Sequence, residues 1–200
     1  RPDVIGDFLA RDPRLAPLIA AHPGLRVPGS FEPFELAIRA VLGQQVSVRA
    51  ATTLSGRFAA AFGEPAQELG EGLSAFFPTA IDVATIPVAR IAAIGMPLAR
   101  AKTIQAIAAA FASGSLANPQ TDLASAVERL VALPGVGPWT AHYVSMRAFH
   151  FSDAFPAGDL GIKKALGLTD PRAVEARSEA WRPWRSYAAL HLWNALAQGG

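Results

Sequence analysis

Two glycines separated by one residue mark the clearest binding feature of this chain. Gly135 and Gly137 lie in residues 133–141 (LPGVGPWTA), between segments whose apolar residues recur at helical spacing. Glycine permits positive φ and leaves no side chain over the turn, so backbone N–H groups there and at the start of the next helix can face an anion. The alternative is a tight connector in which a C-cap glycine ends the first helix.

A single carboxylate stands where a further helix is expected to begin. Asp159 follows an irregular loop that contains Pro156 and Gly158. The simpler interpretation is a helix N-cap that accepts backbone N–H bonds. A helix N-terminus also favours a negative charge, and such a carboxylate can stabilise a positive charge that develops during a reaction. The two roles are compatible. The nearby Asp153 is expected to be a solvated loop residue.

The elements that must position these residues are helices. Ala-rich segments with apolar residues three and four apart recur, and alternation with period two is hard to find. The fold class is therefore predicted to be all-α. The expected helices cover residues 33–42, 46–62, 82–94, 98–112, 121–132, 139–149, 159–167, 171–180 and 183–197. Thr121 and Asp122 are an N-cap pair for the helix over 121–132.

Composition limits the class of protein. The 200 residues suffice for one sizeable domain or two small lobes, and 51% apolar with 17% charged residues predicts a buried core. The chain has no cysteine, which excludes disulfides, thiolate zinc sites and cysteine-held iron–sulfur clusters. No apolar run approaches the roughly 20 residues of a membrane span, and no leader is visible, so a cytoplasmic protein is expected. The net charge of +2 arises in residues 133–200 and permits a polyanionic partner.

The turn and the carboxylate together resemble the helix-hairpin-helix–Gly/Pro–Asp superfamily of DNA glycosylases. The resemblance extends to residues 34–48 (FELAIRAVLGQQVSV), 95–101 (GMPLARA) and 181–193 (WRPWRSYAALHLW). Within the superfamily the chain is most similar to bacterial 3-methyladenine DNA glycosylase II, without the amino-terminal β-rich domain of the two-domain relatives. A compact member, or the glycosylase part of a longer protein, is therefore expected.

The resemblance implies one helical glycosylase domain over residues 1–200, with two helical lobes and the active-site cleft between them. The expected central lobe covers 30–132, and the second lobe covers 133–200 together with 1–29. The implied activity belongs to base excision repair: an alkylated purine is flipped out of double-stranded DNA and its N-glycosidic bond is hydrolysed, which leaves an abasic site. An alkylated purine already carries positive charge, so it leaves without a strong general acid.

Residue roles follow from matching positions in the family. Backbone N–H groups near Gly135, Gly137 and Thr140 are expected to hold phosphates. Asp159 is expected to stabilise the oxocarbenium-like sugar, or alternatively to orient or deprotonate the attacking water. The expected base pocket consists of aromatic rings that attract a cationic base, although the same rings are also plausible core residues: Trp139, Tyr143 and Trp193.

Four positions distinguish this chain from one or another group of its relatives. Trp139 stands where bifunctional relatives carry a lysine that attacks the sugar, so no lyase activity is expected. Gln45, with its neighbour Gln44, stands where close relatives insert an apolar wedge into the duplex; the alternative for Gln45 is a polar surface residue. Gly158 and Leu160 also depart from the common pattern, which leaves the preferred lesion open.

The remaining expectations concern cofactors, partners and rival functions. The backbone carbonyls of Val131, Leu133 and Val136 are expected to bind a monovalent or divalent cation at the hairpin, and no organic cofactor is implied. The expected partner is double-stranded DNA with alkylated bases, bound by a monomer at the bacterial nucleoid, with no membrane. The alternatives are a non-catalytic helix-hairpin-helix DNA-binding module, a helical adaptor, and a glycosylase for oxidised or mismatched bases.

Overall fold

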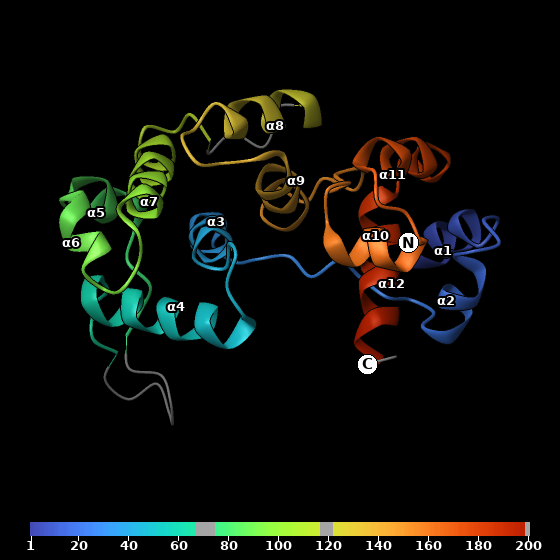
Figure 1. The fold of residues 1–200 in the computed structure, drawn as a ribbon, viewed down its shortest axis with the longest axis horizontal. Coiled ribbons are helices and arrows are strands. Elements are labelled where there is room, and N and C mark those ends of the chain that lie inside the picture. Colours follow the sequence, from blue (N-terminus) through green and yellow to red (C-terminus); the bar gives the residue numbers. More distant parts are fainter. Residues whose placement is uncertain (67–74, 117–121, 199–200) are drawn as a thin grey trace. The chain divides into compact units, whose positions relative to one another are not determined.

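Helices make up the regular structure of this protein. The computed structural model describes residues 1–66, 75–116 and 122–198, and within these ranges the β-structure is one isolated bridge between Pro65 and Ala75. The all-α prediction is confirmed. The helices, coloured along the chain in Figure 1, are α1 (Pro2–Leu9), α2 (Ala16–Ala21), α3 (Pro33–Leu42), α4 (Val48–Phe62), α5 (Ala80–Thr85), α6 (Val88–Ala92), α7 (Leu98–Ala112), α8 (Leu123–Val131), α9 (Pro138–Arg147), α10 (Leu160–Leu166), α11 (Pro171–Ser178), the short 3₁₀ helix η1 (Glu179–Trp181) and α12 (Arg185–Gln198).

The chain divides into two compact units. The central unit is Phe31–Thr140, and the terminal unit is Arg1–Ser30 with Ala141–Gly200. The predicted lobes separated the chain before the hairpin, between residues 132 and 133, whereas the units separate it inside α9. The hairpin belongs to the central unit because Gly135 packs against Thr103 of α7 and the Gln44 side chain hydrogen-bonds to Thr140.

Helix α7 is the centre of the central unit. It packs against α3, α5 and α6. Helix α4 begins at Val48, two residues after the expected start, because the Ser47 hydroxyl accepts a hydrogen bond from the Ala50 N–H at 3.3 Å and so caps the first turn. The fully buried side chains of this unit form one apolar core that includes Ile38, Leu42, Phe58, Ile104 and Leu130.

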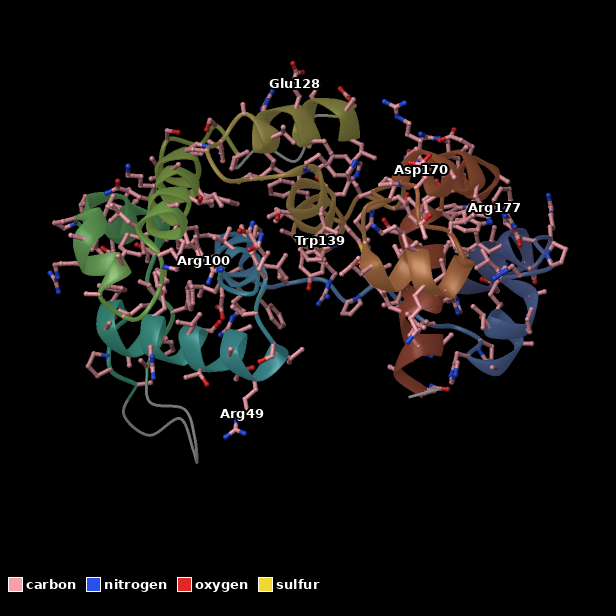
Figure 2. The ribbon with its side chains drawn as sticks, in the orientation of Figure 1. Arg49, Arg100, Glu128, Trp139, Asp170 and Arg177 are labelled. Atoms are coloured by element: carbon pink, nitrogen blue, oxygen red, sulfur yellow. The ribbon has the colours of Figure 1, made fainter. Side chains whose placement is uncertain are left out.

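The terminal unit joins both ends of the chain around α12. This helix packs against α10 and α2. After α1, the carboxylate of Asp12 accepts a hydrogen bond from Trp181 Nε1 at 2.7 Å and pairs with Arg177, which is labelled in Figure 2. Trp181 is fully buried. Asp12 thus fastens the first residues of the chain to its last helices, which explains why residues 1–30 belong to this unit.

Two differences from the predicted helices have simple causes. The helix expected over 82–94 is divided into α5 and α6, because Pro87 offers no N–H and pushes Ile86 into an extended conformation (φ −72°, ψ 130°). The short helices α1 and α2 were not predicted, since eight and six residues carry little periodic signal.

Asp122 caps α8 as expected, while Thr121 lies outside the described residues. Within the described ranges, every helix is too short or too polar to span a bilayer.

Candidate functional site

The Gly-x-Gly turn connects α8 to α9 in the central unit. Gly135 has φ +78°, and a Cβ there would lie 2.0 Å from Thr103 Oγ1, so the turn requires glycine for both conformation and packing. Gly137 has neither constraint, because a Cβ there would meet nothing within 4 Å. The need for a tight connector between the two helices therefore explains the glycine at position 135 but not the one at position 137. The absent side chain at Gly137 leaves open the approach to the start of α9, the end of a helix at which backbone N–H groups can face an anion.

Gln44 and Gln45 follow α3, and the two side chains are placed differently. The Gln44 amide donates to Thr140 Oγ1 at 2.9 Å and lies 3.4 Å from the Gly135 carbonyl oxygen. It therefore braces the hairpin, which conflicts with an inserting role for Gln44. Gln45 is exposed and has φ +55°, a conformation that costs a non-glycine residue about 1 kcal/mol. Arg100, labelled in Figure 2, donates to the Gln44 carbonyl at 2.7 Å and holds this turn.

The predicted cation site lies on the backbone of the same hairpin. The Leu133 carbonyl accepts the Val136 N–H at 3.2 Å, so one lone pair of this oxygen is already used. Across the described parts of the chain, no group of three or more His, Cys, Asp or Glu side chains could hold a metal ion. The structure therefore offers no side-chain support for a cation, and the carbonyl site stays a prediction.

Asp159 caps α10 in the terminal unit. Its Oδ1 accepts two hydrogen bonds, from the Ile162 N–H at 2.8 Å and from Trp193 Nε1 at 2.8 Å. A Cβ at Gly161 would lie 3.0 Å from Asp159 Oδ1 and 3.3 Å from the Trp193 ring, so only glycine lets the carboxylate and the indole meet there without displacement. The cap and the fixed carboxylate predicted from the sequence thus occur in one residue.

The predicted aromatic residues fall in both units. Tyr143 and Trp193 lie close together in the terminal unit, with ring centroids 6.4 Å apart and planes inclined by 53°. Arg147 lies over the Tyr143 ring at 5.6 Å and donates to its hydroxyl at 3.1 Å, so this ring already has one cationic neighbour. Trp139 stands in the first turn of α9 and belongs to the central unit (Figure 2).

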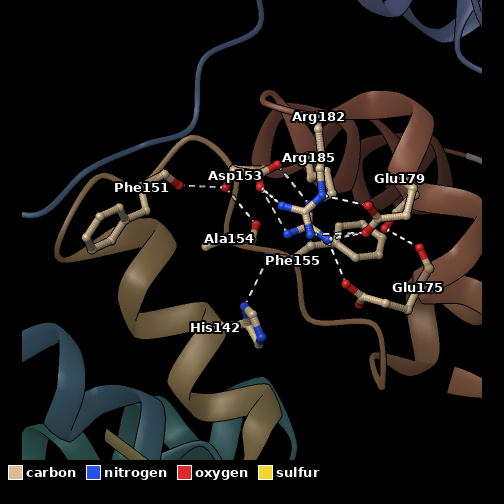
Figure 3. Close-up of polar contacts among 11 residues, drawn as sticks. His142, Phe151, Asp153, Ala154, Phe155, Glu175, Glu179, Arg182 and Arg185 are labelled. Atoms are coloured by element: carbon tan, nitrogen blue, oxygen red, sulfur yellow. Dashed lines mark hydrogen bonds and ion pairs between the residues drawn. The ribbon is translucent and has the colours of Figure 1, made fainter. Parts of the chain in front are cut away.

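An ion network fixes the loop that leads to Asp159 (Figure 3). Arg185 is 3% exposed and binds Asp153 through two nitrogens, at 2.8 and 3.1 Å, and Glu175 at 2.6 Å. Arg182 also pairs with Asp153. The expectation that Asp153 is a solvated loop residue was therefore wrong: its side chain is 19% exposed, because the arginines of a distant segment cover it.

Residues next to this network hold the rest of the same loop. The Ser186 hydroxyl lies 2.8 Å from the Phe151 carbonyl and 2.7 Å from the Ala154 carbonyl, so its single hydrogen serves both oxygens in turn. From the other side, Nδ1 of His142 on α9 accepts the Phe155 N–H at 3.2 Å (Figure 3). The loop lacks helix and sheet, and these side chains supply the partners that its backbone needs.

His142 should make stability depend on pH. Burial lowers the pKa of this imidazole below its ordinary value of 6.5, with the charge of Arg185 acting in the same direction against Glu175 and Asp153. As the pH falls, the unfolded chain therefore binds a proton at this residue before the folded chain does. The contribution of neutral His142 to the free energy of unfolding should be fully present above about pH 6.5 and should decline as the pH falls below it. In His142→Asn, urea unfolding between pH 8 and pH 5 should show a smaller decline than in the wild type. Equal declines would contradict this assignment.

The structure thus gathers the predicted residues into two groups. Asp159, Tyr143 and Trp193 form one group in the terminal unit, and the hairpin glycines with Thr140 and Gln44 form the other in the central unit. Sequence reasoning missed residues that act through a contact distant in the sequence, namely Arg100, Gly161, Arg185 and Ser186. The motifs GMPLARA and WRPWRSY contain three of them, but a motif alone does not say what each residue touches.

Comparisons with known proteins find relatives that cover nearly the whole chain. A probable bifunctional transcriptional activator and DNA repair enzyme, AlkA, of Mycobacterium tuberculosis is 44% identical over 200 residues, which cover 98% of this chain and 40% of the relative. DNA-3-methyladenine glycosylase 2 of Escherichia coli is 38% identical over 195 residues, covering 96% of this chain and 66% of the relative. The chain thus spans about two fifths of the first relative and about two thirds of the second.

The fold and the family are shown by two further matches. The structure of a Schizosaccharomyces pombe 3-methyladenine DNA glycosylase (Mag1) in complex with abasic DNA superposes with a TM-score of 0.75 at 24% identity, covering 94% of each chain. This likeness confirms the predicted fold. The family model described as "HhH-GPD superfamily base excision DNA repair protein" matches residues 38–186. The chain therefore belongs to the HhH-GPD superfamily of base excision DNA repair proteins.

Proposed function

We propose that this chain is a DNA glycosylase that flips an alkylated purine out of a duplex and hydrolyses its N-glycosidic bond. The relatives named as 3-methyladenine glycosylases support this substrate class. The observation that carries the proposal is the geometry of Asp159, an acceptor-only side chain at a helix N-terminus whose Oδ1 is held by two N–H donors. A carboxylate fixed in this way is suited to stabilise a developing positive charge.

The reaction follows from that charge. As the bond between C1′ and the purine nitrogen breaks, both electrons leave with the alkylated base, which becomes neutral, and the sugar acquires oxocarbenium character. Asp159 stabilises this cation. A water oxygen then bonds to C1′ and releases a proton, and the product is an abasic site. Trp193 orients Asp159 through its Nε1–H, and its ring, with that of Tyr143, offers a surface on which a flipped cationic base stacks. Trp139 is proposed as a third aromatic residue that contacts the base.

The hairpin binds the DNA backbone in this function. The N–H groups near Gly135, Gly137 and Thr140 bind phosphate oxygens, and the open side of Gly137 supports this role. Gln45 enters the duplex and hydrogen-bonds to the base left without a partner. Its exposure and its held left-handed backbone support this assignment, while Gln44 braces the hairpin.

A base-release assay tests the proposed function. The purified chain is incubated with duplexes that carry 3-methyladenine, 7-methylguanine, 1-methyladenine, hypoxanthine or ethenoadenine, and free base is measured. Release of one or more alkylated bases is expected. Binding to every duplex with no release would favour a non-catalytic helix-hairpin-helix module, and release from oxidised or mismatched duplexes alone would favour the rival glycosylase class.

The enzyme is expected to lack lyase activity. Trp139 occupies the position at which a lysine amine would attack the sugar, and an indole forms no Schiff base. Borohydride reduction during turnover should therefore give no covalent protein–DNA adduct, and the abasic product strand should stay intact until alkali is added. A stable adduct on the wild-type chain would disprove this part of the assignment.

The proposed enzyme works as a monomer on the DNA of the nucleoid. A monovalent or divalent cation at the carbonyls of Val131, Leu133 and Val136 neutralises part of the phosphate charge at the hairpin. The turn closed by the Val136 N–H and the Leu133 carbonyl supports this proposal.

A further inference from the structure

A groove of about 600 Å³ lies in the central unit between α4 and the connection from α6 to α7. Three arginines line it, Arg49 and Arg57 from α4 and Arg100 from α7, and none of its lining residues is acidic. Three arginines with no acidic residue beside them give the lining of the groove a positive potential. The lining therefore favours a negatively charged ligand.

Two of these arginines are held in place by the backbone. Arg57 Nη1 donates to the Ile94 carbonyl at 3.4 Å, and Arg100 Nη2 donates to the Gln44 carbonyl at 2.7 Å. Gly95 has φ +112°, and a Cβ there would lie 3.1 Å from Arg57 Nη1, so this glycine gives the guanidinium room. Each bond uses one of five donors, which leaves both groups able to bind phosphate oxygens with little loss of side-chain freedom.

Arg49 completes the groove from its outer side. It is exposed and extends away from α4 in Figure 2. It is the second residue of α4, in the first turn after the Ser47 cap, so its charge adds to the positive end of the helix. A phosphodiester backbone meets these requirements better than a small anion, because its charges repeat along the length of a groove.

The Gln44–Gln45 turn lies between this groove and the hairpin. The Gln44 side chain touches the hairpin at Thr140, while the Gln44 carbonyl binds Arg100 of the groove. In the proposed function the hairpin binds phosphates and Gln45 fills the gap in the stack, and the phosphates at the hairpin are assigned here to the strand with the damaged base. A phosphate site on the other side of Gln45 then faces the second strand.

We propose that the groove lined by Arg49, Arg57 and Arg100 binds phosphates of the strand opposite the damaged base. The inference rests on the proposed function, which defines one strand as damaged and the other as opposite to it. The groove and the hairpin then hold the duplex on both sides of the inserted Gln45, which keeps the two strands apart while the base is out of the stack.

The salt dependence of DNA binding tests this site. Binding is measured by fluorescence anisotropy in the Asp159→Asn background, so that the ethenoadenine duplex is not processed, over a range of NaCl concentrations. Adding Arg49→Gln should reduce the slope of log K against log[NaCl] by about 0.9, and adding Arg57→Gln as well should reduce it by about 1.8. Arg90→Gln, an exposed arginine of α6 outside the groove, should leave the slope unchanged.

Uncharged methylphosphonate linkages identify the strand. When they replace the phosphates opposite the lesion, the difference between Arg49 and Arg49→Gln should disappear; the same linkages on the damaged strand should preserve it. An unchanged slope in Arg49→Gln, or a difference that disappears with the damaged strand instead, overturns the proposal. DNA binding is measured in the inactive Asp159→Asn variant, so this test does not depend on catalysis. A wild-type chain that releases no base would refute the glycosylase function, and the binding data would still show whether the groove binds phosphates.

Discussion

Replacing Asp159 with asparagine is expected to lower the rate of base release by about 100- to 1,000-fold while the protein keeps its fold. The amide oxygen of asparagine can still accept the hydrogen bonds from Ile162 and Trp193, and asparagine is as good an N-cap as aspartate. What the variant loses is the negative charge that stabilises the oxocarbenium-like sugar. Single-turnover release of ethenoadenine or 7-methylguanine, measured beside urea unfolding, separates the two effects.

Asp170→Asn is the matched control. Asp170 caps α11 in the same unit and accepts the Arg172 N–H at 3.0 Å, so the exchange changes the same atoms at another helix start. Base release by this variant should equal that of the wild type. If Asp159→Asn released base at the wild-type rate, the catalytic role of Asp159 would be lost and its cap would remain as its whole function.

The sequence predicts the parts of this molecule that depend on neighbouring residues. The cap at Asp159, the turn at Gly135 and the limits of α7 follow from local rules and are found in the structure. One helix was predicted wrongly because the effect of proline on the preceding residue was overlooked. Pro87 divides the segment that was expected to form one continuous helix.

The parts that were missed depend on distant contacts. Asp153 reads as a solvated residue because Arg185, which covers it, lies 32 positions away, and Gln44 reads as a wedge because its partner Thr140 lies 96 positions away. Burial and hydrogen bonding of such side chains depend on how the whole fold packs, and the spacing of residues within one helix does not predict them.

Replacing Arg185 with methionine is expected to lower the free energy of unfolding by about 3 kcal/mol. The methionine keeps an apolar stem of similar length, so the packing of α12 is largely retained, but Asp153 and Glu175 lose the buried cation between them. Arg172→Met, at an exposed position of α11, should change the same quantity by less than about 0.5 kcal/mol. Urea titration of both variants gives the comparison.

A double-mutant cycle with Asp153→Asn shows whether Arg185 acts through the loop. Residues in one ion network should give a coupling energy of about 1–3 kcal/mol, whereas independent effects would add. Because Asp153 lies in the loop that ends at Asp159, base release per folded molecule should also fall in Arg185→Met, and Arg185→Lys should restore only part of it, since an ammonium cannot bind a carboxylate through two fixed nitrogens. Full base release by folded Arg185→Met would show that the network supports the fold without positioning the carboxylate.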